Sequence, residues 1–265
     1  MPGSITATVD ATLARVHLVV TWTGGATSVT VTRLTSSTPT TPVRNGEPGL
    51  LTAGSWQEYD YEAPLDIPVY YQATDGSATA VSPIVTVPSD GLYWLRSPGR
   101  PALNITVEPL EDHASAMTRE LTQGVFRILG REDPVVVSGR RYAPTSVLKF
   151  VTRTDDDRRK MRAILDDGQT LLYQTPGADA AGDDSGYVAV AAYDMTRVGY
   201  MTPERSVTLT VQYVGRPAGP AASGVGGTWA DVLAAYSTWT GVTAAKATWQ
   251  DLLDRIPPGS PPGGP

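Results

Sequence analysis

The chain has 265 residues, and its 26 Gly and 22 Pro indicate many turns, so its length suits two domains and a tail. A formal net charge of −6 argues against a nucleic-acid-binding protein, which would carry a basic surface. With no cysteine, the chain has no disulfide framework, thiolate metal site or cysteine nucleophile.

The N-terminal segment MPGSITATVD lacks the basic and apolar regions of a signal peptide. No run of the sequence reaches the ~20 apolar residues of a membrane span. We therefore expect a soluble protein that is made in the cytoplasm and contacts neither a membrane nor nucleic acid.

Residues 1–88 are predicted to form an all-β module. Val16, Leu18 and Val20 alternate with other residues before Trp22 and a Gly24-Gly25 turn, and residues 28–33 alternate again. A polar connection over 36–48 follows, and then three more extended stretches reach residue 88. The order Trp22, VTVTR, PVYYQATDG resembles a fibronectin type III-like domain, which implies an immunoglobulin-like β-sandwich.

Residues 89–98 are predicted to be a hinge that leads into a second domain, residues 89–215. LNITVEPL is expected to be extended, followed by a polar stretch over 111–122. Next, GVFRILGREDPVVVSG predicts a strand, a turn at 130–134 and a second strand. Later, GYVAVAAYDMTRVGY and ERSVTLTVQYV predict two long strands, the second alternating through Val207, Leu209, Val211 and Tyr213.

Residues 146–175 predict a strand, a short helix and a strand. In the first strand, Leu148 and Phe150 share one face. Thr154 stands at an N-cap position with Asp157 three residues later, as in a capping box. A buried helical stripe is expected at Met161, Ile164 and Leu165, and Gly168 is placed to end the helix in the left-handed conformation.

Residues 216–265 have the composition of a Gly/Pro linker followed by a repeat. Trp229, Trp239 and Trp249 recur every ten residues, each preceded by Thr, which predicts a short helical C-terminal arm. The three Trp side chains either fold back on the second domain or bind a neighbouring protein. We favour partner binding, because interfaces are enriched in aromatic anchors.

The sequence offers little catalytic chemistry. His17 and His113 fall in different predicted domains, and no nucleophile elbow, P-loop or dinucleotide-binding glycine pattern occurs. Asp179, Asp183 and Asp184 lack the spacing of an EF-hand, so a solvated loop is the favoured interpretation. We therefore predict a protein that is not an enzyme, with no catalytic residues, no metal site and no cofactor.

The segment from GVFRILGREDPVVV to LDDGQTLLYQT, with the late strands and the TWADV…TW…TWQDLL tail, resembles minor tail proteins of long-tailed phages (siphoviruses) that infect actinobacteria. Those proteins are similar to the distal tail protein group. The resemblance covers about residues 89–253 and implies a distal-tail or tail-tube-like β-sandwich or split barrel. It also implies a ring, with six-fold symmetry, at the tip of the tail tube. The fibronectin-like module is an addition to the minimal ring protein.

The fold prediction is therefore all-β, with one short helix in the second domain. The predicted function is a virion structural protein of the phage tail tip, a hexamer that joins the tail tube to tip or baseplate proteins. Its expected partners are itself and the tail tube, tape-measure and hub proteins. The alternative is a carbohydrate- or host-surface-binding module of a virion or secreted protein, with Trp56, Tyr59 and Tyr61 as stacking residues unless they belong to the sandwich core or edge.

Overall fold

The computed structural model describes residues 3–35, 40–110, 117–127, 132–133, 135–177, 185–199 and 202–217. Within these ranges the chain is mostly β, with one α-helix and one 3-10 turn, which confirms the predicted fold class. The elements are β1 (Gly3–Asp10), β2 (Arg15–Trp22), β3 (Ser28–Thr35), β4 (Thr41–Pro42), β5 (Gly49–Leu50), β6 (Ser55–Asp60), β7 (Val69–Thr74), β8 (Thr79–Val81), β9 (Tyr93–Arg96), η1 (Pro101–Leu103), β10 (Ile105–Pro109), β11 (Met117–Thr118), β12 (Leu121–Phe126), β13 (Val135–Arg141), β14 (Thr145–Thr152), α1 (Asp155–Asp166), β15 (Leu171–Gln174), β16 (Gly186–Arg197) and β17 (Arg205–Val214).

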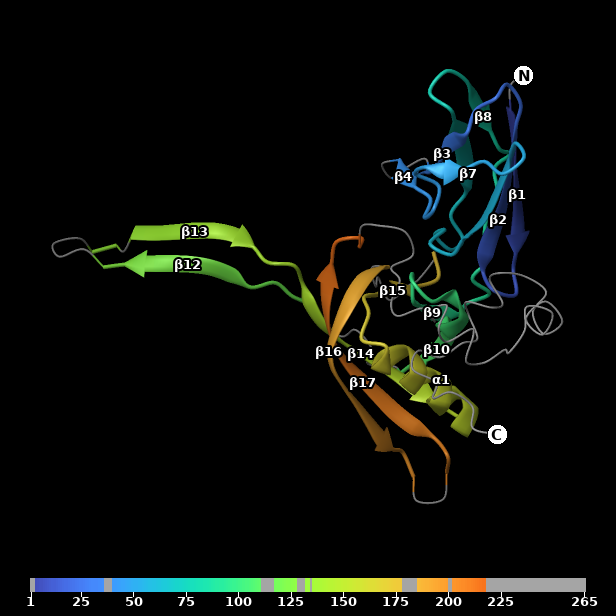
Figure 1. The fold of residues 1–265 in the computed structure, drawn as a ribbon. Coiled ribbons are helices and arrows are strands. Elements are labelled where there is room, and N and C mark those ends of the chain that lie inside the picture. The colour runs from blue at the N-terminus through green and yellow to red at the C-terminus, as the bar shows by residue number, and fades with distance from the viewer. Residues whose placement is uncertain are drawn as a thin grey trace, which may run out of the picture.

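The N-terminal elements β1 to β8 form a two-layered sandwich (Figure 1). One sheet has the order β1-β2-β6, and the other has the order β4-β3-β7-β8 with β5 also paired to β3. The expected alternation in β2 is confirmed, because Val16, Leu18 and Val20 are fully buried between the sheets. Trp22 closes this core, and its indole Nε1 donates to Asp75 Oδ2 at 2.9 Å.

The second group of strands closes into a six-stranded barrel. The order is β10-β9-β15-β16-β17-β14, and β14 pairs back with β10 through Glu108↔Val151 and Pro109↔Phe150. Leu148 and Phe150 share the inner face of β14 and are fully buried, as predicted. The predicted alternation of β17 also holds, with Val207, Leu209 and Val211 buried.

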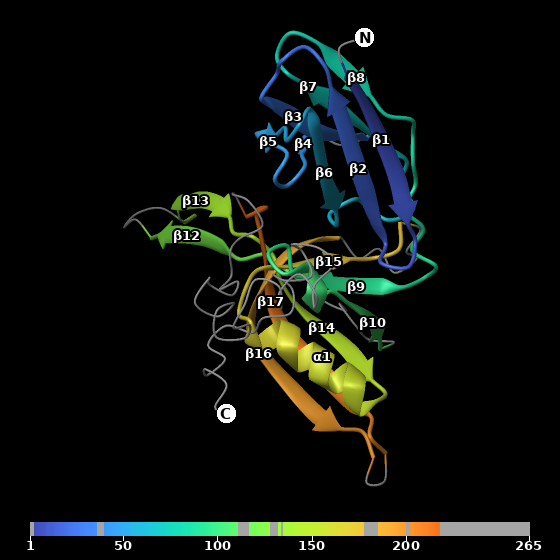
Figure 2. The same ribbon diagram turned by 45° about the vertical axis from the view of Figure 1, so that its right-hand side comes forward.

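Helix α1 lies against this barrel and supplies part of its core (Figure 2). The predicted capping box is present, because Asp157 N donates to Thr154 Oγ1 at 3.1 Å and Thr154 N donates to Asp157 Oδ2 at 3.1 Å. Met161, Ile164 and Leu165 are buried, as expected. Gly168 follows the helix with φ +67°, the left-handed conformation that glycine adopts without strain.

The predicted hinge at 89–98 is wrong, since this segment contains the buried strand β9. Successive side chains of a strand point to opposite sides. Trp94 accordingly joins the core of the sandwich, whereas Leu95 joins the core of the barrel. β9 therefore belongs to both cores at once.

Candidate functional site

Strands β12 and β13 form a hairpin that leaves the body of the molecule, and we call it the arm (residues 121–141). Figure 1 shows the arm projecting away from both the sandwich and the barrel. In the described part of the chain, these two strands pair only with each other, from Leu121↔Arg141 to Phe126↔Val135. The arm is joined to the barrel through β11, which pairs with β14.

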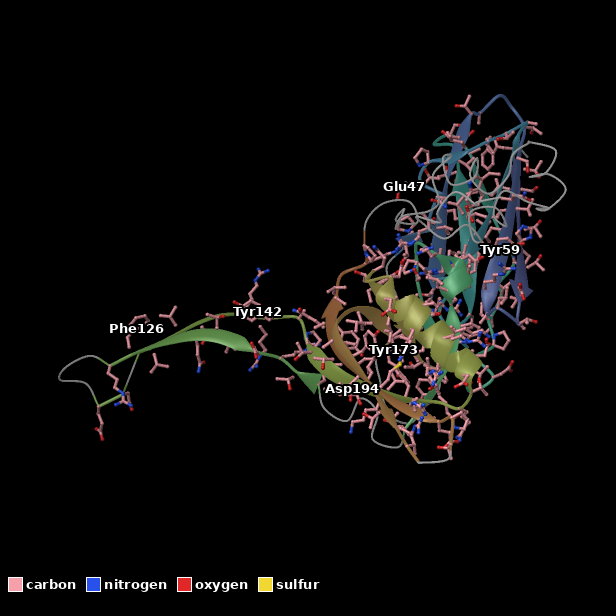
Figure 3. The ribbon with its side chains drawn as sticks, turned by 60° about the horizontal axis from the view of Figure 1, so that its bottom comes forward. Glu47, Tyr59, Phe126, Tyr142, Tyr173 and Asp194 are labelled. Atoms are coloured by element: carbon pink, nitrogen blue, oxygen red, sulfur yellow. The ribbon has the colours of Figure 1, made fainter. Side chains whose placement is uncertain are left out.

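Large apolar side chains of the arm are exposed on both of its faces. Val125 and Phe126 are adjacent in β12, so they point to opposite faces, yet they are 53% and 58% exposed. Val137 in β13 is 60% exposed, and Tyr142 at the base of the arm is also exposed (Figure 3). An isolated two-stranded hairpin is at best marginally stable in water. The arm therefore has the properties of a segment that is completed by a partner.

The sequence predicts the two strands of the arm but not that they project from the body. The sequence pattern indicated a strand, a turn and a second strand, and the two strands are present on either side of the expected turn. The turn at 130–134 lies mostly outside the described residues. That the hairpin leaves the body follows from the pairing of the surrounding strands, which no local pattern encodes.

A second distinctive feature is the buried carboxylate of Glu62, at the junction of the sandwich and the barrel. Glu62 follows β6, and its side chain is 4% exposed. Arg44 Nε from the sandwich donates to Oε1 at 2.7 Å, and Tyr187 Oη from β16 donates to the same oxygen at 2.6 Å. Arg216, just beyond β17, donates from Nε to Oε2 at 3.1 Å. One carboxylate thus holds donors from both parts of the fold.

Further polar contacts cross the same junction. Arg96 of β9 is 1% exposed, and it donates to the carbonyl oxygens of Leu13 at 3.3 Å and Ala14 at 2.9 Å. Its burial lowers the pKa of Arg96 to about 10. Gln174 Nε2 of β15 donates to the carbonyl oxygen of Ala63 at 2.9 Å. Because these bonds satisfy specific backbone groups, they fix how the sandwich sits on the barrel.

The stability of this junction should depend on alkaline pH through Tyr187. Burial, together with the neighbouring Glu62 charge, raises the pKa of the Tyr187 phenol to about 12. The unfolded phenol titrates near 10, so the folded state binds more protons between about pH 10 and 12. The free energy of unfolding should therefore fall as the pH rises through this window.

Urea unfolding at several pH values between 9 and 12 measures this effect. Tyr187→Phe should show a flatter decline than the parent, because it lacks the titrating group. Tyr142→Phe, at the exposed base of the arm, is the matched control and should follow the parent curve. Identical slopes for the parent and Tyr187→Phe would contradict the assignment.

The residues considered for sugar stacking do not form an open platform. Trp56 is 7% exposed and belongs to the sandwich core, with its Nε1 donating to the Asn45 carbonyl at 3.3 Å. Tyr59 is half-buried on the outer face of β6 (Figure 3). Its ring stacks on His17 with centroids 4.7 Å apart, and the Arg15 guanidinium lies 3.8 Å from its centroid. Tyr61 also contacts Arg15, through a hydrogen bond of 2.7 Å to its hydroxyl.

The other residues singled out in the sequence fall into two groups. His17 is a strand side chain, as expected. Trp229, Trp239 and Trp249 lie outside the described residues, as do His113 and the acidic loop of Asp179, Asp183 and Asp184. Across the described ranges, no group of three or more His, Asp or Glu is arranged to hold a metal ion. No helix in those ranges is long and apolar enough to cross a membrane.

No protein-family model matches the chain, and no curated protein matches it. Among solved structures, the chain is similar to the SPP1 Dit (gp 19.1) protein, described as a paradigm of the hub adsorption apparatus in phages that infect Gram-positive bacteria. The identity is 12% and the TM-score 0.30, over 46% of this chain and 49% of that protein. The match thus spans about half the length of that protein, and at this TM-score it does not establish a shared fold.

Proposed function

We propose that this protein is a structural component of a phage tail tip that self-associates through its arm. We further propose that the subunits form a ring, hexameric by the sequence resemblance, that joins the tail tube to tip or baseplate proteins. Within the ring, we assign residues 1–88 to a fibronectin-like module and residues 89–215 to the ring-forming domain. Residues 216–265 form the partner-binding C-terminal arm, which is distinct from the hairpin arm of residues 121–141. The virion is the proposed location, with tail tube, tape-measure and hub proteins as further partners.

The observation that carries this proposal is the exposure of Val125, Phe126 and Val137 on a hairpin that pairs with no other strand among the described residues. Burying these side chains against a second copy would remove their apolar surface from water, at ~25 cal/mol per Å². The free edges of the hairpin could also pair with strands of that copy. The contact is heterologous when the arm docks on the body of a neighbour and not on that neighbour's own arm, and we propose this arrangement. Heterologous contacts generate a closed ring when the rotation that relates each copy to the next leads back to the first copy.

The buried junction supports the same proposal in a second way. A ring requires every subunit to present its arm and the receiving surface at a fixed angle. The hydrogen bonds that Glu62 accepts and those that Arg96 donates hold the sandwich at one angle to the barrel. If the barrels form the ring, each sandwich would therefore keep a defined position on its outside. The glycan-binding alternative gains no comparable support, because Trp56 is buried and Tyr59 already contacts His17 and Arg15.

The test is the mass of the purified full chain in solution, by light scattering over a range of concentrations. We expect an assembly larger than a monomer. Changing Phe126 and Val137 together to Asp should weaken self-association at least ~30-fold, because two charges would have to be buried at the interface. The double variant should keep the far-UV circular dichroism spectrum of the parent, since neither side chain is buried in the body.

Val198→Asp is the matched control, because Val198 is 57% exposed and lies beyond β16, away from the arm. This variant should assemble as the parent does. A parent chain that remains monomeric at all concentrations would contradict self-association. An unchanged assembly in the double arm variant would contradict the role of the arm.

A further inference from the structure

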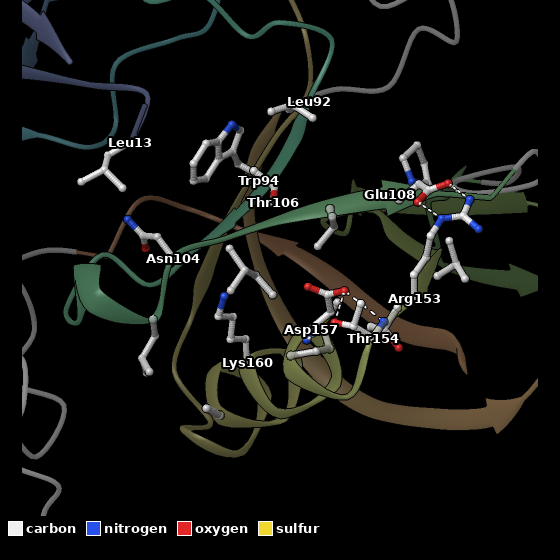
Figure 4. A pocket seen from close by; sticks show the side chains of 18 of the residues that line it. Leu13, Leu92, Trp94, Asn104, Thr106, Glu108, Arg153, Thr154, Asp157 and Lys160 are labelled. Carbon is white, nitrogen blue, oxygen red and sulfur yellow. Dashed lines mark hydrogen bonds and ion pairs between the residues drawn. The ribbon is translucent and has the colours of Figure 1, made fainter. Parts of the chain in front are cut away.

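A groove lies on the barrel between β10 and the N-terminal half of α1 (Figure 4). Its volume is about 820 Å³, within the range of about 300–1,000 Å³ of ligand pockets. It extends to the turn between β1 and β2 of the sandwich, so both parts of the fold line it. Apolar lining comes from Leu103, Ile105 and Met161.

The rim of the groove mixes apolar and polar side chains, with charged Glu108, Arg153 and Asp157 at one end (Figure 4). Leu13, from the β1–β2 turn, and Leu92, just before β9, both line it, and each is 45% exposed. Asn104, Thr106 and Lys160 supply polar groups around the same opening (Figure 4). An apolar floor with a few polar groups at the edge suits amphipathic aromatic side chains such as Trp, which have an apolar ring and one N–H donor.

The sequence contains a segment with side chains of this kind. Residues 218–265 follow the described C-terminal part of the chain, and they hold Trp229, Trp239 and Trp249, each followed three residues later by Val or Leu. The chain enters this segment at Pro217, which with Arg216 lines a different pocket, beside Pro42 and Trp56 of the sandwich. The two pockets share no lining residue.

From these observations we infer that the groove between β10 and α1 of one copy receives the Trp-repeat segment, residues 228–253, of a neighbouring copy. The inference rests on the proposed self-association and names the surface that receives the C-terminal segment. Eleven residues lie between Pro217 and Trp229, so the twelve Cα-to-Cα steps can span about 40 Å when extended. The segment can therefore leave its own body. Within a ring, the linker also keeps it at high effective concentration near the neighbour.

The first experiment places a photo-crosslinking amino acid, benzoylphenylalanine, at Leu92 in the full chain. Isotopically heavy and light chains are assembled together, irradiated and digested for mass spectrometry. We expect crosslinks from position 92 to residues 228–253, with heavy-to-light pairs making up about half of them. The control carries the same amino acid at Ile84, which is 69% exposed but does not line the groove, and should give no such crosslink.

Three outcomes would overturn the inference. Crosslinks only within single chains would place the segment on its own body. Crosslinks to residues 121–141 would make the arm the occupant, and crosslinks of equal yield from position 84 would mean that the contact is not specific. Light scattering on the same samples separates these outcomes from a failure of self-association, because that failure would leave the samples monomeric.

A second experiment needs no unnatural amino acid. Lys246 lies within the Trp repeat and is a trypsin site. Leu92→Asp should accelerate cleavage at Lys246 at least ~5-fold in the assembled protein, whereas Ile84→Asp should leave the rate unchanged. Equal cleavage rates in Leu92→Asp and the parent would contradict docking in this groove.

Discussion

Glu62→Ala should lower the free energy of unfolding by about 3 kcal/mol. The change removes the one acceptor that Arg44, Tyr187 and Arg216 share at the junction. The Arg44 side chain is 9% exposed and that of Arg216 is 26% exposed, so neither guanidinium recovers full hydration in the variant. The cost is mainly that of removing the Glu62 charge from guanidinium groups that stay partly or largely buried.

Chemical denaturation of the full chain measures this loss. Glu62→Gln should be intermediate, since the amide oxygen can still accept from Tyr187 but carries no charge. The matched control is Glu58→Ala on β6, whose carboxylate accepts hydrogen bonds from two uncharged donors, Asn45 Nδ2 at 3.2 Å and the Tyr59 backbone N–H at 3.0 Å, and which should change stability by no more than ~1 kcal/mol. A loss for Glu62→Ala as small as that for Glu58→Ala would show that the junction contributes nothing to stability.

Phe150→Ala should cost about 3–5 kcal/mol through the cavity left in the barrel core. Phe150 is fully buried on β14, and its ring lies 6.0 Å from that of Tyr173 at a tilt of 59°. β14 pairs with β17 along its whole length and with β10 where the barrel closes, so the surrounding backbone can collapse little into the space. The limited relaxation places the expected cost in the upper part of the usual range.

Thermal unfolding followed by circular dichroism would report this change. Val147→Ala is the control on the same strand, because Val147 points outward and is 40% exposed. Its midpoint should move by only a small fraction of the shift seen for Phe150→Ala. Equal shifts for the two variants would mean that β14 does not bury one face in a packed barrel.

The predictions that the structure confirms concern features whose physical cause lies within a few residues. The capping box of Thr154 and Asp157, the buried stripe of α1 and the left-handed Gly168 all follow from helix geometry over one or two turns. The alternations of β2 and β17 follow from the two-residue period of a strand with one buried face. Each of these patterns is local, so one sequence was enough to find it.

Features that join residues far apart in the sequence depend on how the whole chain folds. The segment SDGLYWLRSP predicts a hinge because it begins and ends with turn residues. It is instead buried as β9, because this strand pairs with β10 and β15. Glu62 meets Tyr187 and Arg216 across 125 and 154 residues of chain, a separation over which no spacing rule operates. The arm is exposed because β12 and β13 pair only with each other among the described residues. The pattern of side chains along the sequence indicates which residues prefer to be buried. The pairing of the strands then determines which of those residues lie in a core.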